Sequence, residues 1–232
     1  MRTTRGHKNL ERMLRENTGG GRRDLRTVFE DFVEMCAHTL SNQCDLRSRD
    51  DREAEYLELV GRYSPDELQR FARALGELRL MLGSKRRDVL GELWMTLGLG
   101  SSEMGQFFTP SSVARLMALF HADAIVEQLH DSPYVTVNEP ACGGGVMMLE
   151  LMDVLAERGI DVSSRVICFA EDLSRQAALM AYVQLWLARV PAEVKVMNTL
   201  TREEFGQPWV TPMFARWING HEPALHADVS VA

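Results

Sequence analysis

A glycine-rich segment at residues 138–145, with sequence Asn-Glu-Pro-Ala-Cys-Gly-Gly-Gly, offers the clearest chemistry in this 232-residue sequence. It stands between an expected strand and an expected helix, where glycines let the backbone approach a ligand and the helix start presents free amides. Asp172 follows the next expected strand, where a carboxylate can accept hydrogen bonds from ribose hydroxyls. The two features predict a nucleoside-type cofactor. The alternative is a tight structural turn beside a surface acid.

The elements that would position these residues alternate between strand and helix. Short apolar runs predict strands at 134–138, 165–170 and 193–197, and longer apolar stretches predict helices at 145–157 and 174–189. Strands and helices in this order and of these lengths require right-handed crossovers and a parallel sheet. Further along, the sequence predicts a capped amphipathic helix from the segment Trp209 to Pro212 together with Phe214 and Trp217. We expect its aromatic side chains to cover the sheet, the alternative being that they stack on bases.

The first hundred residues are expected to be helical, because apolar residues recur at helical spacing from about 24 to 99. The clearest helix start is Ser64-Pro65-Asp66-Glu67, where Ser64 and Glu67 can form a capping box before a helix of about 18 residues. A polar loop at 101–108 then leads to a helix that opens at Thr109-Pro110. The fold class predicted is α/β: a helical domain over 24–100, then a truncated Rossmann-like unit with a short parallel sheet over 101–232.

The charge distribution is uneven. The chain has 26 basic and 33 acidic residues and a net charge of −7, which argues against a protein that coats nucleic acid by phosphate attraction alone. Residues 1–26 nevertheless hold eight Lys or Arg against three acids. This segment predicts a basic, flexible arm over residues 1–23, the alternative being a solvated terminus with no partner.

The four cysteines form no Cys-x-x-Cys pair and share no spacing with histidines that would indicate zinc. We therefore expect reduced thiols and no metal site. The first residues are charged, and no apolar run approaches the roughly 20 residues that span a bilayer. The expectation is a cytoplasmic protein with no signal peptide and no membrane contact.

Two motifs carry a family resemblance. Residues 139–145, Glu-Pro-Ala-Cys-Gly-Gly-Gly, resemble the Asp-Pro-Ala-Cys-Gly-x-Gly signature of adenine-specific DNA methyltransferases, in particular the modification subunit of type I restriction systems. Residues 105–110, Gly-Gln-Phe-Phe-Thr-Pro, resemble the upstream motif of that family and stand about 30 residues earlier, as the family order requires. Ala170-Glu171-Asp172 and Asn198-Thr199-Leu200 resemble its turns after the second and third strands. The resemblance covers about residues 93–200.

The resemblance implies S-adenosylmethionine as the cofactor and the adenine amino group of double-stranded DNA as the substrate, in restriction-modification or mobile-element defence. It implies that Gln106 to Pro110 line the methionine end, that the glycine bend passes beneath the cofactor, that Asp172 binds the ribose and that Asn198 bonds the adenine ring. Glu139 stands where the family has Asp. The cofactor-binding residues implied are Gln106, Phe107, Phe108, Thr109, Pro110, Glu139, Cys142, Gly143, Gly145, Asp172 and Asn198.

The sequence departs from the family in one important respect. No Asn/Asp-Pro-Pro-Tyr/Phe motif follows the third expected strand, and in the family that motif holds the flipped adenine. Residues 201–232 are too few for four more strands, and the similar Asp131-Ser-Pro-Tyr134 precedes the first strand, where we expect a turn. No catalytic residue is assigned, and a partner subunit is expected to supply the base pocket and target recognition.

Two alternatives remain. One is an inactive cofactor-binding module that serves regulation or subunit assembly. The other is a dinucleotide-dependent oxidoreductase, which is disfavoured because the motif at 105–110 has no place in it.

Overall fold

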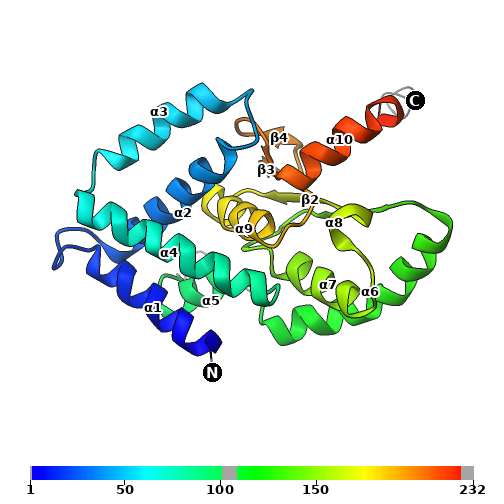
Figure 1. Cartoon of the computed structure of the whole chain (residues 1–232), viewed down its shortest axis with the longest axis horizontal. Helices are drawn as coiled ribbons and strands as arrows, with labels where there is room; N and C mark the ends of the chain where they lie inside the picture. Colours follow the sequence, from blue (N-terminus) through cyan, green and yellow to red (C-terminus); the bar gives the residue numbers. More distant parts are fainter. Residues whose placement is uncertain (1, 101–108, 226–232) are drawn as a thin grey trace.

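The computed structural model describes residues 2–100 and 109–225. The part before the gap is helical, as predicted, and Figure 1 shows its helices stacked beside the sheet. Its elements are α1 (Arg2–Glu16), α2 (Leu25–Ser41), α3 (Arg49–Val60), α4 (Pro65–Ser84) and α5 (Val89–Thr96). The part after the gap contains α6 (Ser111–Asp131), β1 (Val135–Glu139), α7 (Val146–Glu157), α8 (Val162–Arg165), β2 (Val166–Asp172), α9 (Arg175–Leu187), β3 (Ala192–Asn198), β4 (Glu203–Glu204), β5 (Trp209–Val210) and α10 (Pro212–Leu225).

The sheet is built on three parallel strands in the order β1-β2-β3. The strands and their parallel pairing are as predicted, and the register places Asn138 opposite Phe169 and Asp172 opposite Val196. The complete sheet is mixed, however. The chain folds back along the outer edge of β3, where β4 and β5 pair with it in antiparallel orientation. The fold class, helices followed by a Rossmann-like α/β unit, is confirmed.

The two faces of the sheet pack against different layers, because successive side chains of a strand point to opposite faces. Along β2, the side chains of Val166, Cys168 and Ala170 join the main core with α7, α9 and the amino-terminal helices. Ile167 instead packs with Phe214 and Trp217 of α10, and Figure 1 shows α10 on the opposite side of the strands from α7 and α9. The prediction that aromatic residues near the carboxyl terminus cover the sheet is confirmed for Phe214 and Trp217. Trp209 lies instead in strand β5 and packs into the main core.

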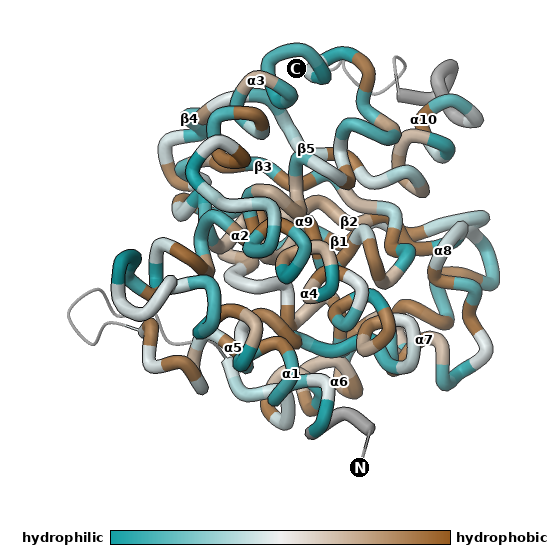
Figure 2. Tube along the Cα trace, turned by 60° about the vertical axis from the view of Figure 1, so that its left-hand side comes forward, coloured by the Kyte–Doolittle hydropathy of each residue, from teal (hydrophilic) through white to brown (hydrophobic). Residues whose placement is uncertain are grey.

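The helix start predicted at Ser64 is present in full. Ser64 caps α4, Pro65 occupies the first turn, and the Glu67 side chain accepts from the Ser64 backbone N–H at 2.8 Å. The apolar residues of α4 then face the same core as α9, and Figure 2 shows hydrophobic and hydrophilic residues alternating along the trace of the helices. The residues of the capping box therefore determine where α4 begins, and the spacing of its apolar residues determines which face is buried.

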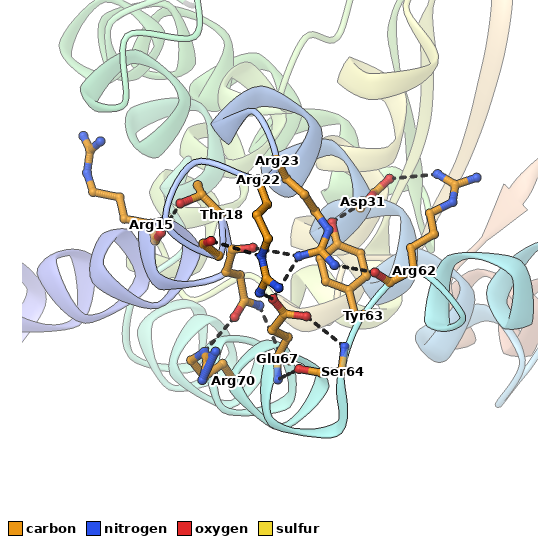
Figure 3. A network of polar contacts seen from close by, with 12 residues as sticks. Arg15, Thr18, Arg22, Arg23, Asp31, Arg62, Tyr63, Ser64, Glu67 and Arg70 are labelled. Carbon is orange, nitrogen blue, oxygen red and sulfur yellow. Dashed lines mark hydrogen bonds and ion pairs between the residues drawn. The ribbon is translucent and has the colours of Figure 1, made fainter.

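The expectation of a flexible basic arm is corrected by helix α1. Leu10, Met13 and Leu14 lie on one helical face, are buried, and pack α1 against α4. The arginines that follow are also engaged: Arg23 Nη1 lies 2.9 Å from Glu67 Oε1, in the network drawn in Figure 3. The prediction missed the apolar stripe of α1 because the many basic side chains, which occupy the solvent side of the same helix, dominate the composition of this segment. Arg12, Arg15, Arg22 and Arg23 all form ion pairs with glutamates.

Helix α6 forms where Thr109-Pro110 predicts a helix start, but its apolar side chains face outward. Ala114, Ala118 and Ala122 make the buried stripe, whereas Leu116 and Phe120 are exposed, Phe120 by 70%. Small residues on the inner face let α6 lie close to α7, with which it packs. Neither α6 nor any other described helix has the combination of length and apolar content needed to cross a bilayer.

Glu67 is expected to contribute to stability in a pH-dependent manner. The Ser64 backbone N–H and the Arg23 guanidinium lower the pKa of Glu67 to about 2, below its unfolded value of about 4.3. The stabilisation is therefore complete above pH ~5 and is lost as the pH falls through about 2. Glu67→Gln should lower the free energy of unfolding by about 2 kcal/mol at pH 7, with the difference shrinking toward pH 2 in urea titrations.

The control for this prediction is Glu58→Gln. Glu58 is an exposed residue of α3 whose ion pair with Arg62 spans one helical turn, and its loss should change the free energy of unfolding by less than about 0.5 kcal/mol. Equal effects of the two substitutions at pH 7 would contradict the role given to Glu67.

Candidate cofactor-binding site

The site is centred on the bend between β1 and α7. Gly143 and Gly145 have φ angles of 54° and 89°, in the left-handed region that favours glycine. A Cβ at Gly145 would also lie 3.3 Å from the Cβ of Ala181. Gly145 is the N-cap of α7, and no side chain caps the amides of the first helical turn. The bend therefore presents bare backbone and free N–H groups at the carboxyl edge of the sheet.

Asp172, at the end of β2, turns toward this bend. Its Oδ2 accepts from the Gly143 backbone N–H at 2.8 Å, and its Oδ1 accepts from the Ser174 backbone N–H at 2.8 Å. Because each carboxylate oxygen has two acceptor sites, both retain capacity for a hydroxyl donor. The glycine bend and the acid, predicted from separate parts of the sequence, are thus in direct contact.

A set of hydrogen bonds made by Gln184 connects the bend to the last of the amino-terminal helices, α5. Gln184 of α9 is fully buried, and its Nε2 donates to the Gly144 carbonyl oxygen at 2.7 Å and to Asp88 Oδ1 at 2.8 Å. Its Oε1 accepts from the backbone N–H groups of Val89 and Leu90 at 2.7 and 3.0 Å. All four hydrogen-bonding positions of the amide are therefore used.

Asp88 is the N-cap of α5, so the start of α5 and the glycine bend share one polar cluster. Burial raises the pKa of Asp88, opposed by Gln184 and the Gly91 N–H. Sequence reasoning missed both residues. The only local signal was Asp88 standing directly before an apolar helical stretch, as an N-cap does.

The turn after β3 is tied to the other two turns. The Thr199 hydroxyl lies 2.7 Å from Glu171 Oε2 and 2.9 Å from the Pro140 carbonyl oxygen, and it donates to one of them at a time. The Glu171 carbonyl in turn accepts from the Cys142 N–H at 2.8 Å. These contacts link the ends of the three strands to one another.

Two predicted site residues lie at the start of the bend, where Cys142 is buried and Glu139 is half-buried. Burial raises the pKa of the Cys142 thiol well above its ordinary value, so Cys142 is a neutral group and is not suited to be a nucleophile. Burial also raises the pKa of Glu139, with a smaller effect from nearby Asp172, although its Oε1 accepts from the Ala141 N–H. All four cysteines are free thiols, as predicted.

The remaining predicted residues are placed as follows. Asn198 Oδ1 accepts from the backbone N–H groups of Leu200 and Thr201, and its amide NH₂ has no hydrogen-bond partner among the described residues. Thr109 and Pro110 border an open cleft of about 730 Å³ that Asp88 and Glu92 also line. Gln106, Phe107 and Phe108 lie outside the described residues.

Asp131-Ser-Pro-Tyr134 is the connection between α6 and β1, as expected of a turn. Tyr134 packs its ring edge-on against Trp217 at 5.1 Å between ring centroids. This segment is therefore part of the cover of the sheet.

Comparison with known families matches residues 89–216, from the start of α5 into α10, to the model described as N-6 DNA Methylase. The matched segment contains Gln184, the bend, Asp172 and Asn198. The chain belongs to the N-6 DNA methylase family. This family membership indicates S-adenosylmethionine as the cofactor.

A solved structure described as a class I S-adenosylmethionine-dependent methyltransferase from Listeria monocytogenes aligns with 81% of this chain, with a TM-score of 0.42 and 14% identity. This chain spans about half of that protein, 52%. No curated protein matches.

The residues of this N-6 DNA methylase-family chain fit the cofactor. An adenosine moiety needs an acceptor for its ribose hydroxyls and open backbone beneath it, and Asp172 and the bend at Gly143–Gly145 provide both in contact with one another. The cofactor supplies an electrophilic methyl group when bound. The protein residues contribute binding and orientation.

Proposed function

We propose that this chain binds S-adenosylmethionine at the glycine bend and contributes to methyl transfer to the exocyclic amino group of adenine in double-stranded DNA. The observation that carries the proposal is the 2.8 Å contact between Asp172 Oδ2 and the Gly143 N–H, which joins the acid to the bend. In this assignment Asp172 binds the ribose, the Asn198 amide donates to the adenine ring, and Gln106 to Pro110 line the methionine end. The biological setting proposed is restriction-modification or mobile-element defence.

The proposal includes a partner polypeptide, because transfer requires donor and acceptor to be held in line at near-contact distance. The sequence has no Asn/Asp-Pro-Pro-Tyr/Phe motif to hold the base. The arginines near the amino terminus that could attract DNA are largely paired with acids, such as Arg23 with Glu67 and Arg12 with Glu16. Base pocket and target recognition are therefore assigned to the partner.

The free edge of β1 is the surface we propose for this partner. Among the described strands β1 pairs only with β2, so its outer backbone groups are open to another strand. Beside it lies a hollow of about 390 Å³ between α6 and β1, lined by apolar residues that include Met117, Ile125 and Val137. The exposed Leu116 and Phe120 extend this apolar area. A strand added here would end next to the glycine bend.

The test combines calorimetry with a radiolabelled transfer assay. Titration with S-adenosylmethionine should give one site per chain. Labelled methyl groups should then enter adenine of unmethylated double-stranded DNA when the chain is supplemented with an extract of host cells that lack its gene. The Asp172→Ala chain in the same extract is the control, and it should give little label.

A second candidate function is favoured by the missing base-holding motif. A cofactor-binding module that serves regulation or assembly would bind S-adenosylmethionine yet transfer no methyl group in any combination. Absence of cofactor binding would contradict both candidates.

A further inference from the structure

A second polar cluster lies between α2, α3 and the start of α9. It contains Glu34 and His38, one turn apart on α2, and Glu55 on α3. His38 is fully buried, and neither of its ring nitrogens makes a hydrogen bond within the described residues. Its Nε2 points into the cluster, 3.4 Å from Glu55 Oε2 and 3.8 Å from Glu34 Oε1. A buried imidazole without hydrogen bonds is costly, so the cluster calls for a ligand.

The spacing of these atoms fits a metal ion. The three potential ligand atoms lie within 4.8 Å of one another. Zinc bonds to His nitrogen and carboxylate oxygen are about 2.0–2.2 Å long, which places the ligands of a tetrahedral ion roughly 3.4 Å apart. We propose that Glu34, His38 and Glu55 bind one divalent transition-metal ion, with the fourth position open to water.

The donor types select the class of ion. An imidazole with two carboxylates suits zinc and its first-row neighbours, whereas calcium and magnesium prefer oxygen ligands alone. The cysteine and histidine spacing in the sequence gave no sign of such a site, because its ligands are one histidine and two glutamates from separate helices.

Arg175 is the competitor for this site. Its Nη2 lies 2.7 Å from Glu34 Oε1 and 3.0 Å from Glu55 Oε2, the same two oxygens that face His38. Two cations cannot share these oxygens at low cost, so the metal must displace the guanidinium. The Arg175 side chain is 44% exposed and has room to turn toward solvent. Because Arg175 follows Asp172 by three residues, occupancy of the site acts on the first turn of α9 beside the cofactor-binding acid.

The experiment measures zinc binding to the full, tag-free chain after treatment with a chelator, by competition with a chromogenic zinc indicator. We expect one zinc per chain. Glu55→Gln should weaken binding at least about tenfold, and because Glu55 is 54% exposed this substitution leaves the core intact. Arg175→Gln should tighten binding several-fold because it removes the competing cation. Glu58→Gln, on the same helix and outside the cluster, is the matched control and should bind as the unaltered chain does.

Two results would overturn the site: no bound zinc, or binding in the Glu55→Gln chain equal to that of the Glu58→Gln control. If the Arg175→Gln chain bound zinc no more tightly than the unaltered chain, the proposed competition between Arg175 and the metal would be wrong. A cobalt titration gives an independent readout, since a four-coordinate protein site produces visible absorption that hydrated cobalt lacks. Loss of these bands in Glu55→Gln, with unchanged circular dichroism, is the expected result.

Discussion

Asp172→Ala is expected to weaken S-adenosylhomocysteine binding at least about tenfold, because it removes a charged acceptor for ribose hydroxyls whose hydrogen bonds contribute about 1.5–3 kcal/mol. The same substitution removes the bonds to Gly143 and Ser174 that hold the bend. Isothermal calorimetry measures the affinity, and thermal unfolding without ligand measures the effect on the bend alone.

An analogue of S-adenosylhomocysteine that lacks one ribose hydroxyl separates these two effects. Loss of the hydroxyl should weaken binding to the unaltered chain but cost little further affinity in the Asp172→Ala chain. The control is Asp161→Ala, which alters an acid that caps α8 at the other end of β2 and should leave affinity unchanged. If the losses of affinity caused by the substitution and by the missing hydroxyl were additive, Asp172 would not contact the ribose.

Gln184→Leu is expected to lower the free energy of unfolding by about 3 kcal/mol and to weaken cofactor binding. The change keeps the size of the side chain but leaves the Val89 and Leu90 N–H groups, Asp88 and the Gly144 carbonyl without their buried partner. Urea unfolding measures the stability, and calorimetry below the unfolding transition measures the affinity.

Gln176→Leu is the matched control for this prediction. Gln176 lies two turns earlier on α9, and its Nε2 has no hydrogen-bond partner within the described residues. Its replacement should therefore be tolerated. If both substitutions changed stability equally, the network around Gln184 would not be what holds the glycine bend.

The network also links the helical part of the chain to the proposed cofactor site. Gln184 and Asp88 are 96 residues apart, yet one hydrogen bond joins them beneath the bend. The family match begins at Val89, the first residue of α5 and the residue that follows Asp88. Helix α5 thus belongs structurally with the sheet, although its sequence reads as the last of the amino-terminal helices.

The sequence alone determined most of the elements and which residues meet at the proposed site. Apolar periodicity located the strands and helices, the capping box at Ser64 located the start of α4, and the order of elements required parallel strands. Because parallel strands bring their carboxyl ends to one edge, the bend at Gly143 and the acid at Asp172 could be placed together before any coordinates. The roles of all the predicted site residues toward the cofactor, Asp172 and the glycine bend included, stay predictions.

Only the tertiary structure decided the rest. The packing of α1, the outward face of α6, the antiparallel strands on β3, the Asp88–Gln184 hydrogen bond and the Glu34–His38–Glu55 cluster all depend on residues distant in sequence. The spacing of apolar residues indicates which side of an element is buried, and a helix cap is a hydrogen bond between residues close in sequence. Both features can therefore be predicted from a short stretch of sequence. Which polar groups meet in the interior depends on how whole elements dock, and no short stretch of sequence carries that information.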